Sequence, residues 1–254
     1  MDFLNALILL LNYIFVPALA YGSQLAIGAI FVTLIYGILR FANFATGDMM
    51  SFGTMVAILF TWYFQSLGLS LGFLPTALLA IPFAILFMGL YMLIIDKFVF
   101  KYYRLNKSPP VQLAMVSIGV MFVTQAVVRI IIGPSDRRFF DGEKFLIKAN
   151  EFKEMTGLNE GLAIKSTQVI TIVVTIILVS TLFWFLNKTK TGKSMRAYSD
   201  NEDLALLSGI DPKRIVMITW MIAAILATIG GVLYGLDKSF KPFTYFNNML
   251  PIFA

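Results

Sequence analysis

Long apolar runs, each about the length needed to cross a lipid bilayer, dominate this chain and restrict the folds open to it. They occupy approximately residues 4–20, 25–39, 49–67, 72–95, 111–132, 167–186 and 215–236, and a partial eighth run covers 243–254. A membrane helix needs about 20 such residues to span a hydrocarbon core of about 30 Å. We therefore predict an all-α integral membrane protein, a polytopic helical bundle that forms one domain over residues 1–254.

The composition also favours membrane helices over a barrel or an enzyme. Of the 254 residues, 59% are hydrophobic and 13% are charged, whereas soluble domains contain roughly 45–50% apolar residues. The runs lack the alternation of barrel strands, so their backbone polar groups must be satisfied within helices. Cysteine and histidine are absent from the sequence, which excludes thiolate nucleophiles, disulfides and the commonest metal sites. We predict no enzymatic activity, no resident cofactor and no metal site.

Basic residues gather in two short segments between the apolar runs. Residues 96–107 carry four basic residues against one acid, and residues 188–214 carry six against four. The positive-inside bias places both segments in the cytoplasm, and the more balanced segment 133–165 on the opposite side. The formal net charge of +6 is thus explained by membrane topology, and we expect no nucleic acid as a partner.

The sequence F-A-N-F-A-T-G-D at residues 41–48 interrupts an apolar run. Interrupted helices at membrane depth are tolerated where the backbone is buried or lines a cavity, and in transporters their ends commonly bind solute or ions. This interpretation predicts a substrate pathway at Asn43, Thr46, Gly47 and Asp48. The alternative is an ordinary cytoplasmic turn in which Asp48 caps the next helix. The residues alone leave both possibilities open.

A charged segment at residues 187–214 is typical of a helix that contacts something outside the membrane. Ser199 and Glu202 match a capping box, which predicts a short helix over about 200–208 that stops at Gly209. Such a short helix is marginal alone, because isolated helices below about 12 residues barely hold in water. Its predicted docking face is an apolar stripe bounded by acids, made of Leu204 and Leu207 with Asp200, Glu202 and Asp203.

The following helix is predicted to begin with Asp211 as its cap and Pro212 as its first residue. Small residues recur on this helix at every fourth position, namely Ala223, Ala227, Gly231 and Gly235. A ridge of this kind lets a neighbouring backbone approach closely. A displacement of the short helix at 200–208 would therefore be delivered into a tightly packed bundle.

Three blocks together resemble the permeases of branched-chain amino acid ABC importers, specifically the LivH-like permease subunit. The block at residues 36–48 is similar to the family's run around N-F-A-H-G-E, with Thr46 and Asp48 in place of the usual histidine and glutamate. The blocks at 191–210 and 230–235 are similar to the family's cytoplasmic coupling segment and its A-G-V-L-x-G motif. Family members continue into further membrane helices, so the C-terminus is expected to be truncated.

The resemblance implies a multi-pass permease of the bacterial inner membrane, surrounded by membrane lipid, that imports branched-chain amino acids or a related small solute such as urea or an amide. Its implied partners are a second permease, two cytoplasmic ABC ATPases that bind the ATP, and a periplasmic solute-binding protein. The implied coupling contacts to the ATPase are Arg196, Asp200, Glu202, Asp203, Leu204, Leu207 and Gly209.

Two other functions remain open at this stage. The break at residues 41–48 is also compatible with an ion-coupled secondary transporter of a small solute, which would need no ATPase. The short helix at 200–208 is also compatible with a membrane scaffold that docks a soluble protein without transporting anything.

Overall fold

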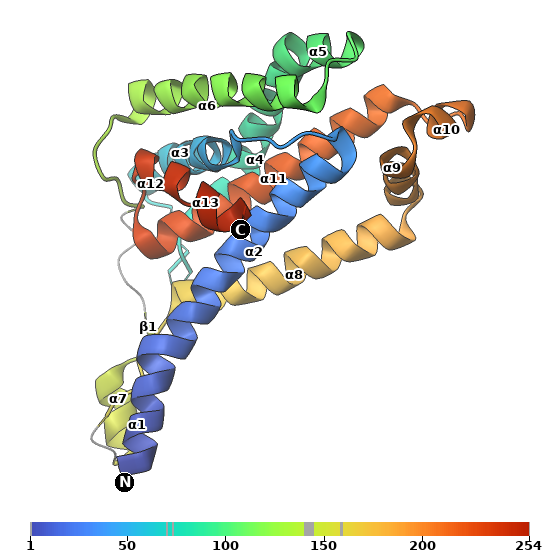
Figure 1. The fold of residues 1–254 in the computed structure, drawn as a ribbon. Coiled ribbons are helices and arrows are strands. Elements are labelled where there is room, and N and C mark those ends of the chain that lie inside the picture. The colour runs from blue at the N-terminus through green and yellow to red at the C-terminus, as the bar shows by residue number, and fades with distance from the viewer. Residues whose placement is uncertain (1, 70, 73, 140–144, 158–159, 254) are drawn as a thin grey trace.

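The computed structural model describes residues 2–69, 71–72, 74–139, 145–157 and 160–253, and this part of the chain is a bundle of long helices (Figure 1). Its described residues contain five helical stretches that are long and apolar enough to cross a membrane: Phe3–Leu39, Ala77–Leu105, Pro110–Ile132, Ser166–Lys188 and Pro212–Lys238. The predicted all-α, multi-pass membrane fold is confirmed.

The first membrane helix runs without interruption through the point where we expected two spans. It consists of α1 (Asp2–Leu10), the π-helical turn η1 (Leu11–Phe15) and α2 (Val16–Leu39). The prediction of separate spans at 4–20 and 25–39 is wrong, because the uncharged residues between them include no proline and can stay helical. The π turn has a local cause: Pro17 has no N–H to donate to the carbonyl of Tyr13.

Two further helices return across the bundle. α3 (Thr46–Ser66) covers the predicted run at 49–67, but it is not among the five most apolar stretches of the described residues. Thirteen of its 21 residues are buried, including the polar residues Ser51 and Thr54. α4 (Ala77–Ile95) starts later than predicted and continues through η2 (Asp96–Phe100) into α5 (Lys101–Leu105). Most of the basic segment that we expected as a loop is therefore helical.

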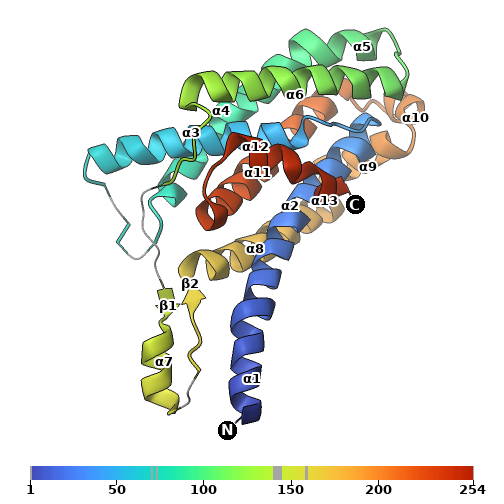
Figure 2. The ribbon, with the colours of Figure 1, turned by 60° about the vertical axis from the view of Figure 1, so that its left-hand side comes forward.

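The segment between α6 (Pro110–Ile132) and α8 (Ser166–Lys188) forms a small unit at one end of the molecule. Strand β1 (Phe145–Ile147) pairs antiparallel with β2 (Ile164–Lys165), and α7 (Ala149–Thr156) lies between them in sequence. Asn12 of the first helix accepts a hydrogen bond from the Ala163 backbone N–H over 3.2 Å. Figure 2 shows this unit beside α1, at the opposite end of the molecule from α5 and α10.

The second half of the chain supplies the central helix. After α8 come α9 (Lys190–Asp200), α10 (Glu202–Leu207) and α11 (Pro212–Lys238). α11 packs against α2, α3 and α4, and its Trp220 is fully buried. α5, α9 and α10 gather at one end of the bundle (Figure 1). Both basic segments thus lie at the same end, which the positive-inside bias assigns to the cytoplasm.

The last described residues fold back onto the bundle. α12 (Pro242–Asn247) and α13 (Met249–Phe253) replace the partial span predicted at 243–254, whose final residue lies outside the described part. Pro251 lacks an N–H and so weakens a continuous helix here. The hydroxyl of Tyr245 donates to the Gly231 carbonyl over 2.9 Å, and Ile252 packs beside Gly28 of α2. This end of the chain is therefore integrated into the core.

Candidate functional site

The break between α2 and α3 is a buried turn at the basic end of the bundle. Arg40 ends α2 in the left-handed conformation, with φ of 60°. The Asn43 Oδ1 then accepts the Ala45 N–H over 3.1 Å, and the Thr46 hydroxyl donates to the Asn43 carbonyl over 2.6 Å. Asn43 and Thr46 are both buried. Asn43 therefore builds the turn inside the protein. In the alternative of an ordinary cytoplasmic turn, the predicted cap is wrong, because Ala45 and not Asp48 occupies the N-cap position of α3.

Asp48 differs from its neighbours because the fold leaves its carboxylate without hydrogen bonds. The residue lies in the first turn of α3 and is 1% exposed, and neither oxygen has a partner among the described residues. It is within electrostatic range of Arg129 on α6 and of Tyr91 on α4. The Tyr91 hydroxyl is itself hydrogen-bonded to Thr124 over 2.7 Å. An unpartnered buried carboxylate is costly, so a proton or a cationic group is needed there.

The four predicted pathway residues consequently have different places in the structure. Asn43 and Thr46 use their polar atoms to hold the turn. Gly47 packs so closely against the Tyr245 carbonyl that a side chain would not fit without a shift. Among these four residues, only Asp48 has buried side-chain oxygens with no hydrogen-bond partner in the described part of the chain.

A half-buried ion pair connects η2, α5 and α11 at the basic end. Both guanidinium nitrogens of Arg104 donate to the Asp96 carboxylate, over 2.6 and 2.9 Å, and the Trp220 indole N–H donates to the same carboxylate over 2.7 Å. Trp220 stacks on Phe100 with ring centroids 5.5 Å apart, and Phe100 lies 5.0 Å from Phe41 in the break. The break is thus connected to the basic end through packed aromatic rings.

The charged segment contains two helices, and its cap differs from our prediction. α9 runs to Asp200, and Asn201 caps α10 by accepting the Leu204 N–H over 3.0 Å. The predicted capping box is wrong because Ser199 is still helical and donates instead to the Gly37 carbonyl of α2 over 2.5 Å. Gly209 has φ of +80° and follows α10, as expected for a stop.

The start of α11 matches its sequence signals. The Asp211 side chain accepts the Lys213 N–H over 3.0 Å, and Pro212 is the first helical residue. The predicted cap is therefore present.

The leucines of α10 face away from the protein. Leu204 is 61% exposed and Leu207 is 84% exposed, whereas Ala205 is buried. Asp200, Glu202 and Asp203 are exposed around them. An apolar surface at the charged end of a membrane protein is typical of a contact with another protein.

Two other residues of the charged segment, Tyr198 and Arg196, are held in place by side-chain hydrogen bonds. The Tyr198 hydroxyl donates to Glu202 over 2.8 Å. Burial raises the pKa of Tyr198, and the Glu202 carboxylate raises this pKa further. Arg196 points elsewhere: its guanidinium donates to the Asn187 side chain over 2.9 Å, next to α8. The structure therefore separates Arg196 from the exposed face of α10.

A cleft of about 470 Å³ lies between α4–α5 and the start of α10–α11. Its walls carry charges of both signs, and they include Asp96, Lys97, Lys101 and Arg104 on one side and Tyr198, Glu202, Asp211 and Lys213 on the other. The cleft opens beside the exposed face of α10. It offers a mixed-charge surface to a protein that docks at this end.

The small-residue ridge of α11 lies in the core. Ala223 and Ala227 are fully buried. A Cβ atom on Gly231 would come within 2.5 Å of the Met50 carbonyl oxygen, and one on Gly235 within 2.9 Å of the Tyr245 hydroxyl. α11 therefore approaches the α3 backbone directly, so movement of one helix requires movement of the other.

The sequence analysis missed three contacts that matter here: Asp96 with Arg104 and Trp220, Ser199 with Gly37, and Tyr198 with Glu202. The contacts of Asp96 with Trp220 and of Ser199 with Gly37 join residues far apart in the chain. The third is an i, i+4 pair, which a helical reading of 190–207 would have suggested. Our expectation of a helix starting at 200 concealed it.

The known proteins that are similar to this chain are membrane permeases. A family model described as branched-chain amino acid transport system / permease component matches residues 14–254. The permease protein LivH of the high-affinity branched-chain amino acid transport system in Escherichia coli (strain K12) is 27% identical over 218 residues, covering 84% of this chain and 67% of that protein.

Two further relatives show the same relationship. The corresponding permease BraD of Pseudomonas aeruginosa is 26% identical over 224 residues, covering 87% of this chain and 70% of the relative. A probable branched-chain amino acid transport permease, LivH of Methanocaldococcus jannaschii, is 26% identical over 246 residues, covering 93% and 70%. No solved structure matches the chain. With five apolar helices and a family match over nearly its whole length, this chain belongs to the permease components of branched-chain amino acid transport systems.

Proposed function

We propose that the chain is a transmembrane permease subunit of an ATP-binding-cassette importer, which moves branched-chain amino acids across the bacterial inner membrane. ATP hydrolysis on partner subunits would drive the transport. The observation that carries this proposal is α10, a six-residue helix at the basic end whose Leu204 and Leu207 are 61% and 84% exposed. A helix this short needs a partner to be stable, and its leucines lie beside charged groups.

The proposed partner of α10 is a cytoplasmic ABC ATPase. The leucines would enter an apolar groove of the ATPase, while Asp200, Glu202 and Asp203 would meet polar groups at its rim. Gly209 would set the angle at which the chain leaves α10. A second permease and a second ATPase would complete the membrane assembly, and a periplasmic solute-binding protein would deliver the solute to the opposite end.

Movement of α10 would be transmitted to the membrane helices through the contacts of α9 and α11. α10 follows α9 after the single residue Asn201, and α9 is tied to α2 by the Ser199 to Gly37 hydrogen bond. On its other side, α11 begins three residues after Gly209 and packs against α2, α3 and α4. Closure of the ATPases would therefore displace α9, α10 and α11 as one unit, a rigid-body change between two packed arrangements.

The proposed solute pathway passes the turn between α2 and α3. Asp48 would attract the ammonium group of an amino acid, because its buried carboxylate lacks a partner. Asn43, Thr46 and Gly47 would shape the turn that presents it. Changing Asp48 to Asn should lower uptake while the ATPase still copurifies, whereas Asn43→Leu should impair folding because it removes the acceptor of the Ala45 N–H.

The direct test is solute uptake into proteoliposomes that hold this chain with its candidate second permease, ATPases and binding protein. Leucine accumulation that requires both internal ATP and the binding protein would support the proposal, and competition with valine, urea and acetamide would define the solute. The buried carboxylate of Asp48 is also compatible with an ion-coupled transporter. Accumulation driven by an ion gradient without ATP would replace the proposal with that alternative.

Docking through α10 can be tested separately with Leu207→Arg. This change places a charge on the most exposed leucine of α10, so the ATPase should no longer copurify, while membrane insertion remains normal. Met155→Arg on α7 is a matched control, since Met155 is 87% exposed at the opposite end. It should retain the ATPase. Normal ATPase binding and uptake by the Leu207 variant would contradict docking through α10.

A further inference from the structure

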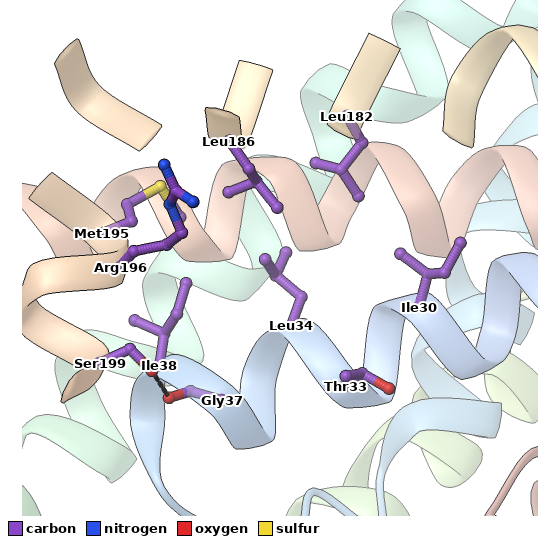
Figure 3. Close-up of a pocket in the computed structure, with 10 residues that line it drawn as sticks. All are labelled: Ile30, Thr33, Leu34, Gly37, Ile38, Leu182, Leu186, Met195, Arg196 and Ser199. Atoms are coloured by element: carbon purple, nitrogen blue, oxygen red, sulfur yellow. Dashed lines mark hydrogen bonds between the residues drawn. The ribbon is translucent and has the colours of Figure 1, made fainter. Parts of the chain in front are cut away.

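A groove with apolar walls lies between α2, α8 and α9, at the basic end of the bundle (Figure 3). It has a volume of about 260 Å³. Its apolar side chains come from all three helices and include Ile30, Leu34 and Ile38 on α2, Leu182 and Leu186 on α8, and Met195 on α9. On α8 only Ser166, Thr171 and Thr175 are buried, so the helix that forms this wall of the groove is itself little covered by the rest of the bundle.

The hydroxyl groups in the groove are occupied by the fold itself. Thr33 donates to the Ala29 carbonyl over 2.7 Å, and Ser199 donates to the Gly37 carbonyl over 2.5 Å. The walls therefore present hydrocarbon to an occupant and offer it few polar contacts. A hydrocarbon chain is the chemistry that suits such a surface.

One cationic side chain, that of Arg196, lines the groove, and three lysines lie close to it in the sequence. Arg196 is exposed, lines the groove in Figure 3 and forms no ion pair with the described residues; its one recorded hydrogen bond goes to Asn187. Lys188, Lys190 and Lys193 are exposed on the same segment and also lack ion pairs within the described part of the chain. The groove thus combines an apolar floor with a surplus of positive charge.

The groove lies at the depth in the membrane where the lipid acyl chains meet the headgroups. α8 is long and apolar enough to span the bilayer and ends at Lys188, so Leu182 and Leu186 lie in the last turns before the aqueous phase. Arg196 follows on α9, outside that span. Basic pockets at the cytoplasmic ends of membrane helices are suited to anionic lipid headgroups.

We propose that this groove binds an anionic phospholipid, with an acyl chain along α2 and α8 and the phosphate at Arg196. A guanidinium group can donate two parallel hydrogen bonds to a phosphate. A protein helix fits less well, because a helix about 10 Å wide needs roughly 120 Å³ per residue, so the groove holds only about two residues of helix. The bound lipid would cover the hydrogen bond between Ser199 and Gly37, and it would brace α9 against α2.

The first test measures lipid selectivity of the purified full-length chain. Native mass spectrometry in detergent would follow titration with phosphatidylglycerol and with phosphatidylcholine of the same acyl chains. A basic side chain near a membrane surface contributes about 1 kcal/mol to binding an anionic lipid, so phosphatidylglycerol should bind about fivefold more tightly. Arg196→Gln should abolish this preference. Lys153→Gln on α7, a change of the same charge at the opposite end, should preserve it.

The second test fills the groove. Leu182→Trp places a bulky indole ring in the groove and should weaken binding of both lipids. The control is Phe183→Trp, on the neighbouring residue, whose side chain is 71% exposed. This change should leave both affinities unchanged. This pair keeps the proposal testable if the Arg196 variant does not fold. Equal affinity for the two lipids, or a preference retained by Arg196→Gln, would overturn the proposal. Loss of the preference when the chain is assembled with its partners would also overturn it and assign the groove to a protein neighbour.

Discussion

The close contact between α11 and α3 in the core can be tested with a single methyl group, by changing Gly231 to Ala. A Cβ at this position of α11 would lie 2.5 Å from the Met50 carbonyl oxygen of α3 and would also press on the Thr54 side chain. Real Cβ atoms do not approach a carbonyl oxygen this closely. Because the obstacle includes backbone, it cannot turn aside as a flexible side chain would, and the two helices must separate.

The expected loss follows from two opposing effects. Overpacking a well-filled core costs about 1–3 kcal/mol, and a rigid backbone neighbour places this site toward the upper end. Alanine regains roughly 1 kcal/mol over glycine through helix propensity. The net loss should be about 2 kcal/mol, which for a chain of this size corresponds to a melting temperature lower by about 4–8 °C.

Thermal unfolding in detergent, followed by tryptophan fluorescence, to which the buried Trp220 contributes, would measure the shift. The control is Gly119→Ala on α6, where an added Cβ meets nothing within 4 Å, so this variant should be as stable as the original chain or slightly more so. If Gly231→Ala melted at the same temperature as Gly119→Ala, the close packing of α11 on α3 would be refuted.

Three further predictions concern the basic end of the bundle. Replacing Asn201 with Ala removes the cap of α10, so the free energy of opening this helix should fall by about 1 kcal/mol, seen as faster amide exchange over residues 202–207. Asp96→Ala leaves the half-buried guanidinium of Arg104 without its carboxylate and the Trp220 N–H without its acceptor. The free energy of unfolding should therefore fall by about 2 kcal/mol. An unchanged denaturation midpoint would contradict this. The folded-state pKa of Tyr198 is raised above its ordinary value of 10.0, so its contribution to stability is complete below pH 10 and declines as the pH rises above it; Tyr198→Phe should reduce the alkaline loss of stability.

Predictions from the sequence succeeded where the determining interaction was local. The apolar runs at 111–132, 167–186 and 215–236 correspond to α6, α8 and α11 within a few residues, because the length and apolarity of a span belong to its own residues. Asp211 and Pro212 began their helix as expected for the same reason. Local signals failed where two helical states compete, as at Ser199, whose capping pattern is overridden by a longer α9 docked on α2.

The candidate site was accessible to sequence reasoning only in part. The break at 41–48 was visible as a run of small and polar residues, but which of its side chains remain unsatisfied was not. That distinction depends on the hydrogen bonds of Asn43 and Thr46 and on the enclosure of Asp48 by neighbouring helices. The same applies to Arg196, which the resemblance grouped with the ATPase contacts and the structure places in an apolar groove.

The sequence by itself determined that this protein is a helical membrane protein with its basic segments at one end, since bilayer length, backbone satisfaction and charge placement are properties of contiguous residues. It also determined the family, through motifs that extend along the chain. Only the tertiary structure decided which polar groups are buried, paired or left free. Asp96 meets Trp220 across 124 positions and Ser199 meets Gly37 across 162, and such contacts exist only once the helices pack.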